Sequence, residues 1–221
     1  MERYSVKLTG TTGCLMHQDN LSWSEQIKKW QMNPDNKKFS VAGDDRSPAW
    51  TWVGSLYMDA GKVCIPADNL QTLVREGGSR VMTGRGKETL KKRAAAGIVV
   101  DQAAWPLVGS KGLIDVAPIL ALVEAQDMDF GKYEAVAKDL GFELFVKRAR
   151  IGTSKHVRVR PRFDVWSAEG TLTVTDEAIS ESLLKSILVE AGERSGIGDW
   201  RPSSPSRPGP WGKFTFTLKK L

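Results

Sequence analysis

The order of apolar and polar positions predicts strands near both ends of the chain and helices between them. Residues 3–9 and 213–218 alternate apolar with polar side chains, as half-buried strands do. In residues 176–191 the apolar side chains recur every three or four positions, which is typical of an amphipathic helix, and Gly192 follows as a stop signal. The chain therefore carries both strand and helix patterns along its length.

The same criteria predict further elements between these three. Helices are expected over residues 22–32, 48–58, 67–75, 117–126 and 130–140. Strands are expected over residues 61–65, 98–100, 113–116, 142–146, 157–163 and 171–175. We expect Ser22 to cap the first of these helices and the pair Gly77–Gly78 to end the third.

The order of these elements indicates the fold class. They contain the series strand, helix, strand, strand, helix, strand, which is the split βαβ or ferredoxin-like arrangement. We therefore predict an α+β fold, an elaborated ferredoxin-like (RRM-like) antiparallel sheet with helices on one face. It would form a single domain over residues 1–221, with inserted loops and helices at about 14–60 and 79–140.

Composition limits the possible classes of protein. Of the 221 residues, 41% are hydrophobic and 26% are charged, which is ordinary for a globular domain. No apolar run approaches the ~20 residues that a membrane-spanning helix needs. The N-terminal segment lacks the charged and then apolar layout of a signal peptide. We expect a cytoplasmic protein with no membrane partner.

Cysteine and histidine are too few for a disulfide framework or a metal quartet. Cys14 and Cys64 are the only cysteines, and His17 and His156 are the only histidines. The adjacent acids Asp44–Asp45 could bind Mg²⁺, but such pairs in loops are far more often turn formers. We expect no metal and no other cofactor.

Basic residues concentrate in one segment. Between Glu143 and Asp164 lie seven of them and no acid: Lys147, Arg148, Arg150, Lys155, Arg158, Arg160 and Arg162. The whole chain has 32 basic and 26 acidic residues, so 32 less seven leaves 25 basic against 26 acidic. The net charge of +6 is thus a property of this segment, which also contains His156.

The spacing within this segment is specific. Arg158, Arg160 and Arg162, which we call the arginine row, alternate with apolar residues. In a strand the row would lie on one face at intervals of about 7 Å, close to the phosphate spacing of an extended single strand of nucleic acid. The alternative is a solvated sheet face with dispersed counter-ions. Because no acid within the segment can pair with the row, we favour phosphates as its ligands.

Two further segments point to a family. Residues 63–70 read Val-Cys-Ile-Pro-Ala-Asp-Asn-Leu, with Arg75 after them, and residues 192–201 read Gly-Glu-Arg-Ser-Gly-Ile-Gly-Asp-Trp-Arg, before Gly212-Lys213-Phe214. They resemble RAMP proteins, the superfamily that builds the RNA-binding backbones of CRISPR effector complexes. In that family a strand ends in Ile-Pro-Gly before a helix, and a glycine-rich loop joins the last helix to the last strand.

The resemblance covers about 40 residues and has two departures. Ala67 stands where the family has glycine, and the glycine-rich loop is longer and carries four prolines. The overall arrangement is also similar to uncharacterised proteins of tailed phages and prophages. The resemblance implies a ferredoxin-like fold and RNA binding.

The glycine-rich loop is a candidate phosphate site on its own residues. A glycine-rich turn lets backbone N–H groups approach a phosphate, Arg194 and Arg201 add charge, and Trp200 could stack on an unpaired base. If the open face of the sheet presents the arginine row beside this loop, the two form one basic groove. The alternative is an ordinary structural connection.

Catalytic groups are scarce. RAMP relatives include metal-independent endoribonucleases that use a histidine, so His17 and His156 are weak candidates for a general base. Neither has a second catalytic partner at a recognisable spacing. Histidines in such positions are more often ordinary loop residues or additional polar contacts than catalytic groups.

Three functions remain open. The first is a non-enzymatic protein of phage or prophage type that binds single-stranded RNA or DNA in a basic groove and self-associates along the strand. The second is an endoribonuclease of the same fold. The third is a phage interaction protein that targets a host nucleoprotein or defence complex. We favour the first, because the basic segment is prominent and a catalytic group is missing.

Overall fold

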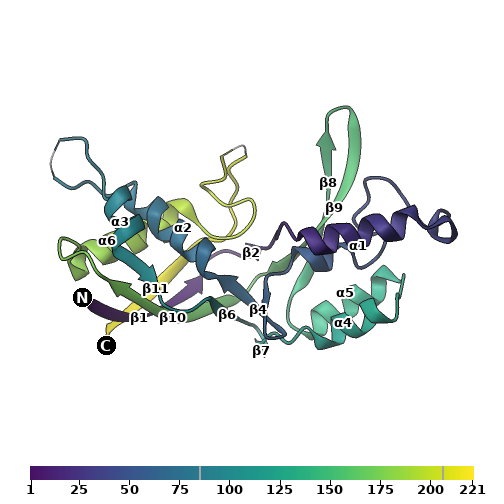
Figure 1. Ribbon diagram of the computed structural model, residues 1–221, viewed down its shortest axis with the longest axis horizontal. Helices are drawn as coiled ribbons and strands as arrows, with labels where there is room; N and C mark the ends of the chain where they lie inside the picture. Colours follow the sequence, from purple (N-terminus) through teal and green to yellow (C-terminus); the bar gives the residue numbers. More distant parts are fainter. Residues whose placement is uncertain (85, 206) are drawn as a thin grey trace. The chain divides into compact units, whose positions relative to one another are not determined.

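The computed structural model describes residues 1–84, 86–205 and 207–221, and for Ile151 only the backbone (Figure 1). The chain forms two compact units, each built from separate stretches of sequence. Unit 1 comprises residues 1–15, 64–109 and 164–221, and unit 2 comprises residues 16–63 and 110–163. Helices and a mostly antiparallel sheet make the fold α+β, which confirms the predicted class.

An antiparallel sheet forms the base of unit 1. Its neighbouring strands follow the order β11, β1, β10, β6 and β4, and β5 also pairs with β10. The strands are β1 (Glu2–Gly10), β4 (Lys62–Pro66), β5 (Ile98–Val100), β6 (Ala104–Gly109), β10 (Trp166–Val174) and β11 (Phe214–Lys220). Ser5 of β1 lies opposite Thr171 on one side and Lys219 on the other. The alternation in both terminal segments thus produces two adjacent strands, with β11 at the edge of the sheet and β1 inside it.

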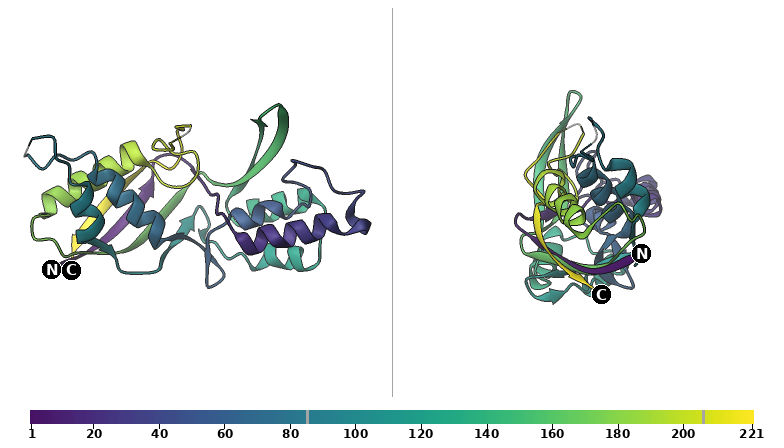
Figure 2. Two further views of the ribbon diagram at one scale, coloured as in Figure 1. Left: turned by 45° about the horizontal axis from the view of Figure 1, so that its top comes forward. Right: turned by 90° about the vertical axis from the view of Figure 1, so that its left-hand side faces the viewer.

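Helices cover one face of this sheet (Figures 1 and 2). They are α2 (Ala67–Gly78), α3 (Lys91–Gly97) and α6 (Glu181–Glu190), and α6 continues into a π-helical turn, Ala191–Ser195. Val6 and Leu8 of β1 meet Leu70 of α2 and Leu188 of α6 around a very small void. The face with Val6 and Leu8 is therefore the core face, because both side chains are almost completely buried there.

One of the two predicted helix boundaries is wrong and the other is confirmed. Asn20, not Ser22, caps α1 (Leu21–Met32), because the side chain of Asn20 accepts a hydrogen bond from the backbone N–H of Trp23. Gly77 and Gly78 are the last two residues of α2, so the helix ends at the predicted pair. A Cβ atom on Gly77 would lie 2.3 Å from the carbonyl oxygen of Ile187, so glycine here allows α2 and α6 to pack closely.

Aromatic side chains form the centre of unit 2. Trp52 contacts Tyr133 and Phe142 edge to face, at centroid distances of 6.3 and 6.1 Å, and Phe142 lies 5.0 Å from Phe163. The helices around them are α1, α4 (Ala117–Glu124) and α5 (Phe130–Asp139), together with the 3₁₀ turns η1 (Pro34–Asn36) and η2 (Thr51–Ser55). The short strands are β2 (Cys14–Leu15), which belongs to unit 1, and β3 (Met58–Asp59) and β7 (Gly112–Leu113) in unit 2.

The helix expected over residues 48–58 is only the 3₁₀ turn η2. Its hydrogen bonds join residues three apart, such as the N–H of Leu56 to the carbonyl of Val53. Four consecutive residues of this turn, 52–55, are buried, so it is enclosed on several sides. An amphipathic helix would bury only one stripe.

The arginine row is not part of the sheet in unit 1. It lies on β9 (Ser154–Phe163), which pairs with β8 (Glu143–Ile151) in a separate antiparallel sheet. The expectation that the open face of the ferredoxin-like sheet carries this row is therefore wrong. The sequence showed correctly that residues 157–163 form a strand, but local alternation does not say which sheet a strand joins.

In the part of the chain that the structure describes, no helix is long and apolar enough to cross a bilayer.

The packing of α2 against α6 makes a prediction about Gly77. In an exposed helix, glycine to alanine stabilises by about 1 kcal/mol. We expect Gly77→Ala to lower the free energy of unfolding by about 1–3 kcal/mol instead, because its methyl group would overlap the backbone of α6. Denaturant unfolding measures the difference. Gly131→Ala, at an exposed position of α5, is the control and should raise the free energy of unfolding by up to about 1 kcal/mol, and a stabilised Gly77→Ala variant would contradict the close approach.

Candidate nucleic-acid interface

The basic segment folds as a β-hairpin in unit 2. β8 and β9 pair along their whole length, with Lys147 opposite Arg158 and Arg150 opposite Lys155. The tip of the hairpin extends beyond α1, α4 and α5 of its unit (Figure 1). We call residues 147–158 the distal hairpin. It carries five of the seven cations of the segment and no acid.

Cations lie on both faces of the distal hairpin. Directly opposite residues of an antiparallel pair share a face. Lys147 and Arg158 therefore share one face, and Arg150 and Lys155 share the other, together with Arg148. The side chains of Lys147, Arg148, Arg150 and Lys155 are all exposed. A ligand with several negative charges would thus meet positive charge from either side.

The arginine row lies on one face, as predicted, but its charges are compensated. Arg158 and Arg160 form ion pairs with Asp45, which lies more than 110 residues away in the chain, and Arg162 pairs with Glu143 on β8. The expectation of a row without acidic partners is therefore wrong. The partners were not visible because one comes from a distant loop and the other from the boundary of the basic segment.

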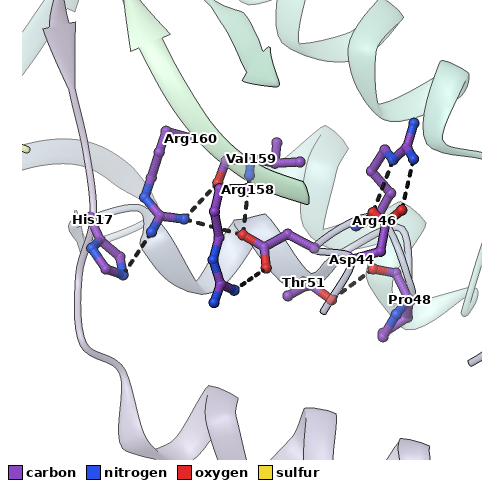
Figure 3. Close-up of polar contacts among 9 residues, drawn as sticks. His17, Asp44, Arg46, Pro48, Thr51, Arg158, Val159 and Arg160 are labelled. Carbon is purple, nitrogen blue, oxygen red and sulfur yellow. Dashed lines mark hydrogen bonds and ion pairs between the residues drawn. The ribbon is translucent and has the colours of Figure 1, made fainter. Parts of the chain in front are cut away.

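Asp45 is the centre of this cluster, and its three hydrogen-bond donors, Arg158, Val159 and Arg160, are labelled in Figure 3. One carboxylate oxygen accepts a hydrogen bond from Nη1 of Arg158 at 2.8 Å. The other accepts from Nη1 of Arg160 at 3.3 Å and from the backbone N–H of Val159 at 3.1 Å. Asp45 is only 8% exposed, so these three donors replace the water that its charge would otherwise bind.

The backbone around Asp45 is also joined to β9. The N–H of Asp45 donates to the carbonyl of Val157, and the N–H of Val157 donates to the carbonyl of Gly43, at 3.0 and 2.8 Å. Gly43 has a φ of 75°, and a Cβ atom there would lie 2.3 Å from Nδ1 of His156. The imidazole of His156 thus lies close against this backbone, and its buried Nδ1 has no partner among the described residues.

His17 has a different environment. Its Nε2 lies 3.2 Å from Nη2 of Arg160. Because a guanidinium group only donates hydrogen bonds, Nε2 must accept, and the imidazole is neutral in this contact. Arg160 therefore lies beside His17, whereas Gly43 lies beside His156.

A cavity of about 400 Å³ opens beside the arginine row, within unit 2. Its walls include His17, Trp23 of α1, Asp45, Arg158 and Arg160. Sequence reasoning placed the two arginines on a flat strand face and did not predict a cavity there.

The glycine-rich loop in unit 1 is held by its own contacts. Arg201 donates to Glu76 and to the carbonyl of Gly198, each at 3.3 Å, and to Ser203 at 3.0 Å. Arg194 pairs with Glu190 one helical turn earlier, at 3.4 Å. Ser206 of this loop lies outside the described residues. Arg201 thus acts as a structural bridge to α2.

Backbone N–H groups of this loop are used internally. Those of Gly196, Ile197, Asp199, Ser203, Gly209 and Gly212 all donate to carbonyl groups of unit 1. Trp200 adopts a φ of 50°, and its N–H donates to the side chain of Asp199. The expectation that this loop offers a set of open N–H groups to a phosphate is therefore wrong, because the same groups close the loop upon itself.

The two cysteines give no sign of chemistry. Both thiols are buried, and burial raises the pKa of Cys14 to about 12. Among the residues that the structure describes, no group of three or more histidine, cysteine or acidic side chains could hold a metal ion.

No protein-family model matches the chain, and no curated protein is significantly similar to it.

The Asp45 cluster makes a stability prediction. Asp45→Asn should lower the free energy of unfolding by about 1–3 kcal/mol, because it leaves two guanidinium groups without their shared carboxylate. Its neighbour gives the matched control. The Arg46 guanidinium lowers the pKa of Asp44, but Asp44 pairs with this one arginine only, whose side chain is exposed and can return to water, so Asp44→Asn should cost less than Asp45→Asn. If the two variants lose the same free energy of unfolding in urea, the Asp45 cluster is no more important for stability than the pair of Asp44 and Arg46.

Proposed function

We propose that this protein binds single-stranded RNA or DNA in the cytoplasm, through phosphate contacts of the hairpin formed by β8 and β9. The observation that carries this proposal is the distal hairpin, with exposed cations on both faces and no acidic residue. Binding to phosphates releases condensed counter-ions, which favours any cluster of exposed lysine and arginine residues.

The cations of the hairpin fall into two groups with different roles. Arg158 and Arg160 share Asp45 near its base, so part of their charge is already neutralised. Within the described residues, Arg148 and Lys155 have no ion pair, and Arg150 donates only to the nearby carbonyl of Gly152. We assign the main phosphate contacts to Arg148, Arg150 and Lys155, and a supporting role to the arginine row.

The spacing of these cations fits an extended strand. Arg148 and Arg150 are two residues apart on β8, which places them about 7 Å from each other on one face. Phe145 lies on the other face, opposite Arg160, and the guanidinium of Arg162 is 5.9 Å from the Phe145 ring. An aromatic ring beside a basic track is typical of proteins that bind single strands with little sequence preference.

For the fold we propose a ferredoxin-like arrangement in unit 1, of the kind found in RAMP proteins, with a phage or prophage origin. The strand order β11, β1, β10 and then β5 or β6 supports it, as does the placement of α2 and α6 between successive strands. Copies of the protein would self-associate along one strand, each contributing its hairpin.

A salt titration of binding tests the function. Replacing Arg148, Arg150 and Lys155 together by Gln should weaken binding of a 30-nucleotide strand on the order of 10–100-fold near 100 mM salt. The slope of log K against log salt should fall by about 2, because three phosphate contacts are lost. Fluorescence anisotropy with a labelled strand measures both.

The matched control removes the same charge elsewhere. Lys91, Lys92 and Lys219 are exposed cations of unit 1, and replacing them together by Gln should change affinity much less than the hairpin variant. If the two triple variants lose the same affinity, the loss comes from the change in net charge and not from the hairpin. Salt-independent binding by the wild-type protein, or none, would refute the proposal.

A further inference from the structure

The cavity beside the arginine row has the size of a ligand site. Its volume of about 400 Å³ falls within the range of roughly 300–1,000 Å³ that small-molecule sites occupy. It is formed inside unit 2 by the segment before α1, the first half of α1, η2 and β9. Arg158 and Arg160 line the cavity and belong to the arginine row as well. The row lies on the face of the hairpin opposite to Arg148, Arg150 and Lys155, so a strand whose phosphates also contact the row would pass the opening.

The charges of the walls balance. Arg158 and Arg160 face two carboxylates, Asp45 and Asp19, and His17 is neutral in its contact with Arg160. A phosphate would gain little from such a set. A neutral ring with several donors and acceptors suits it better, because Asp19 can accept from an amino group and Arg158 can donate to a ring nitrogen or carbonyl.

Aromatic rings complete the lining. Trp23 and Trp52 both border the cavity, and the Nε1 donor of each has no acceptor among the described residues. Trp23 is half-buried and packs edge to face on Trp50, at a centroid distance of 5.6 Å, so its ring is held in place. A fixed indole beside polar groups is a suitable surface for a planar heterocycle.

We propose that this cavity receives one base of the bound strand. The base would leave the stack and enter beside Trp23, while its flanking phosphates stay on the hairpin. This inference rests on the proposed function and makes it more specific, because a base inside a duplex cannot be extruded without an unpairing cost. Single strands are thereby preferred over duplexes of the same length.

The affinity for a strand without bases distinguishes the contribution of the cavity from that of the hairpin. A 30-nucleotide strand of abasic residues keeps every phosphate and has nothing to insert. We expect wild-type protein to bind the normal strand at least about fivefold more tightly than the abasic strand, the gain typical of one stacked base. Equal affinity for the two strands would overturn the proposal, and failure to bind either would instead reject the proposed function.

Two substitutions on α1 localise the effect. Ser24 lines the cavity, so Ser24→Trp should fill it and remove the preference for the normal strand, without a change in binding of the abasic strand. Ser22 is equally exposed on the same helix but does not line the cavity, so Ser22→Trp should behave as wild type. If Ser24→Trp keeps the preference, the base does not enter here. If a free nucleoside monophosphate binds as tightly as the strand, the cavity is a site for free nucleotides and the proposal fails.

Discussion

The buried carboxylate of Asp45 holds the base of the hairpin in place. It forms ion pairs with Arg158 and Arg160 and offsets one of their two positive charges, accepts a hydrogen bond from the N–H of Val159, and lies in a loop whose backbone pairs with Val157. Without this charge, two guanidinium groups in a partly buried site would repel each other. The position of Arg160 in turn fixes His17, since the imidazole accepts a hydrogen bond from that guanidinium. The loop, the strand and one wall of the cavity thus depend on one acidic side chain.

This arrangement separates rigidity from binding within one hairpin. Near the base, the arginines form ion pairs with acidic side chains. These pairs hold the arginines in place and lower the net positive charge there. Towards the tip, exposed cations keep their charge on both faces of a two-stranded ribbon, which by itself would be marginally stable. We infer that the base supplies the stability which the tip lacks. A binding arm of this kind needs both parts, because repulsion among its cations opposes folding.

Local patterns in the sequence were sufficient to predict helices and strands, but not to predict which of them pack or pair with one another. The strand at 157–163 and the helix within 176–191 follow from periodicity alone, and both are present. Nothing local revealed that β9 belongs to another sheet, or that Asp45 reaches the arginine row from over 110 residues away. The close approach of α6 to Gly77 could not be read from the sequence of α2 either. Long-range contacts decided each of these cases, and single-sequence patterns do not encode them.

The central claim is that the hairpin is the part of the protein that touches nucleic acid. Ultraviolet cross-linking of wild-type protein to a 30-nucleotide strand, followed by mass spectrometry of the cross-linked peptides, tests it directly. The account predicts that cross-links concentrate in residues 144–160 and around Trp23, and that they fade as salt is raised. Cross-links confined to the glycine-rich loop or to the sheet of unit 1, with the hairpin unlabelled, would contradict it.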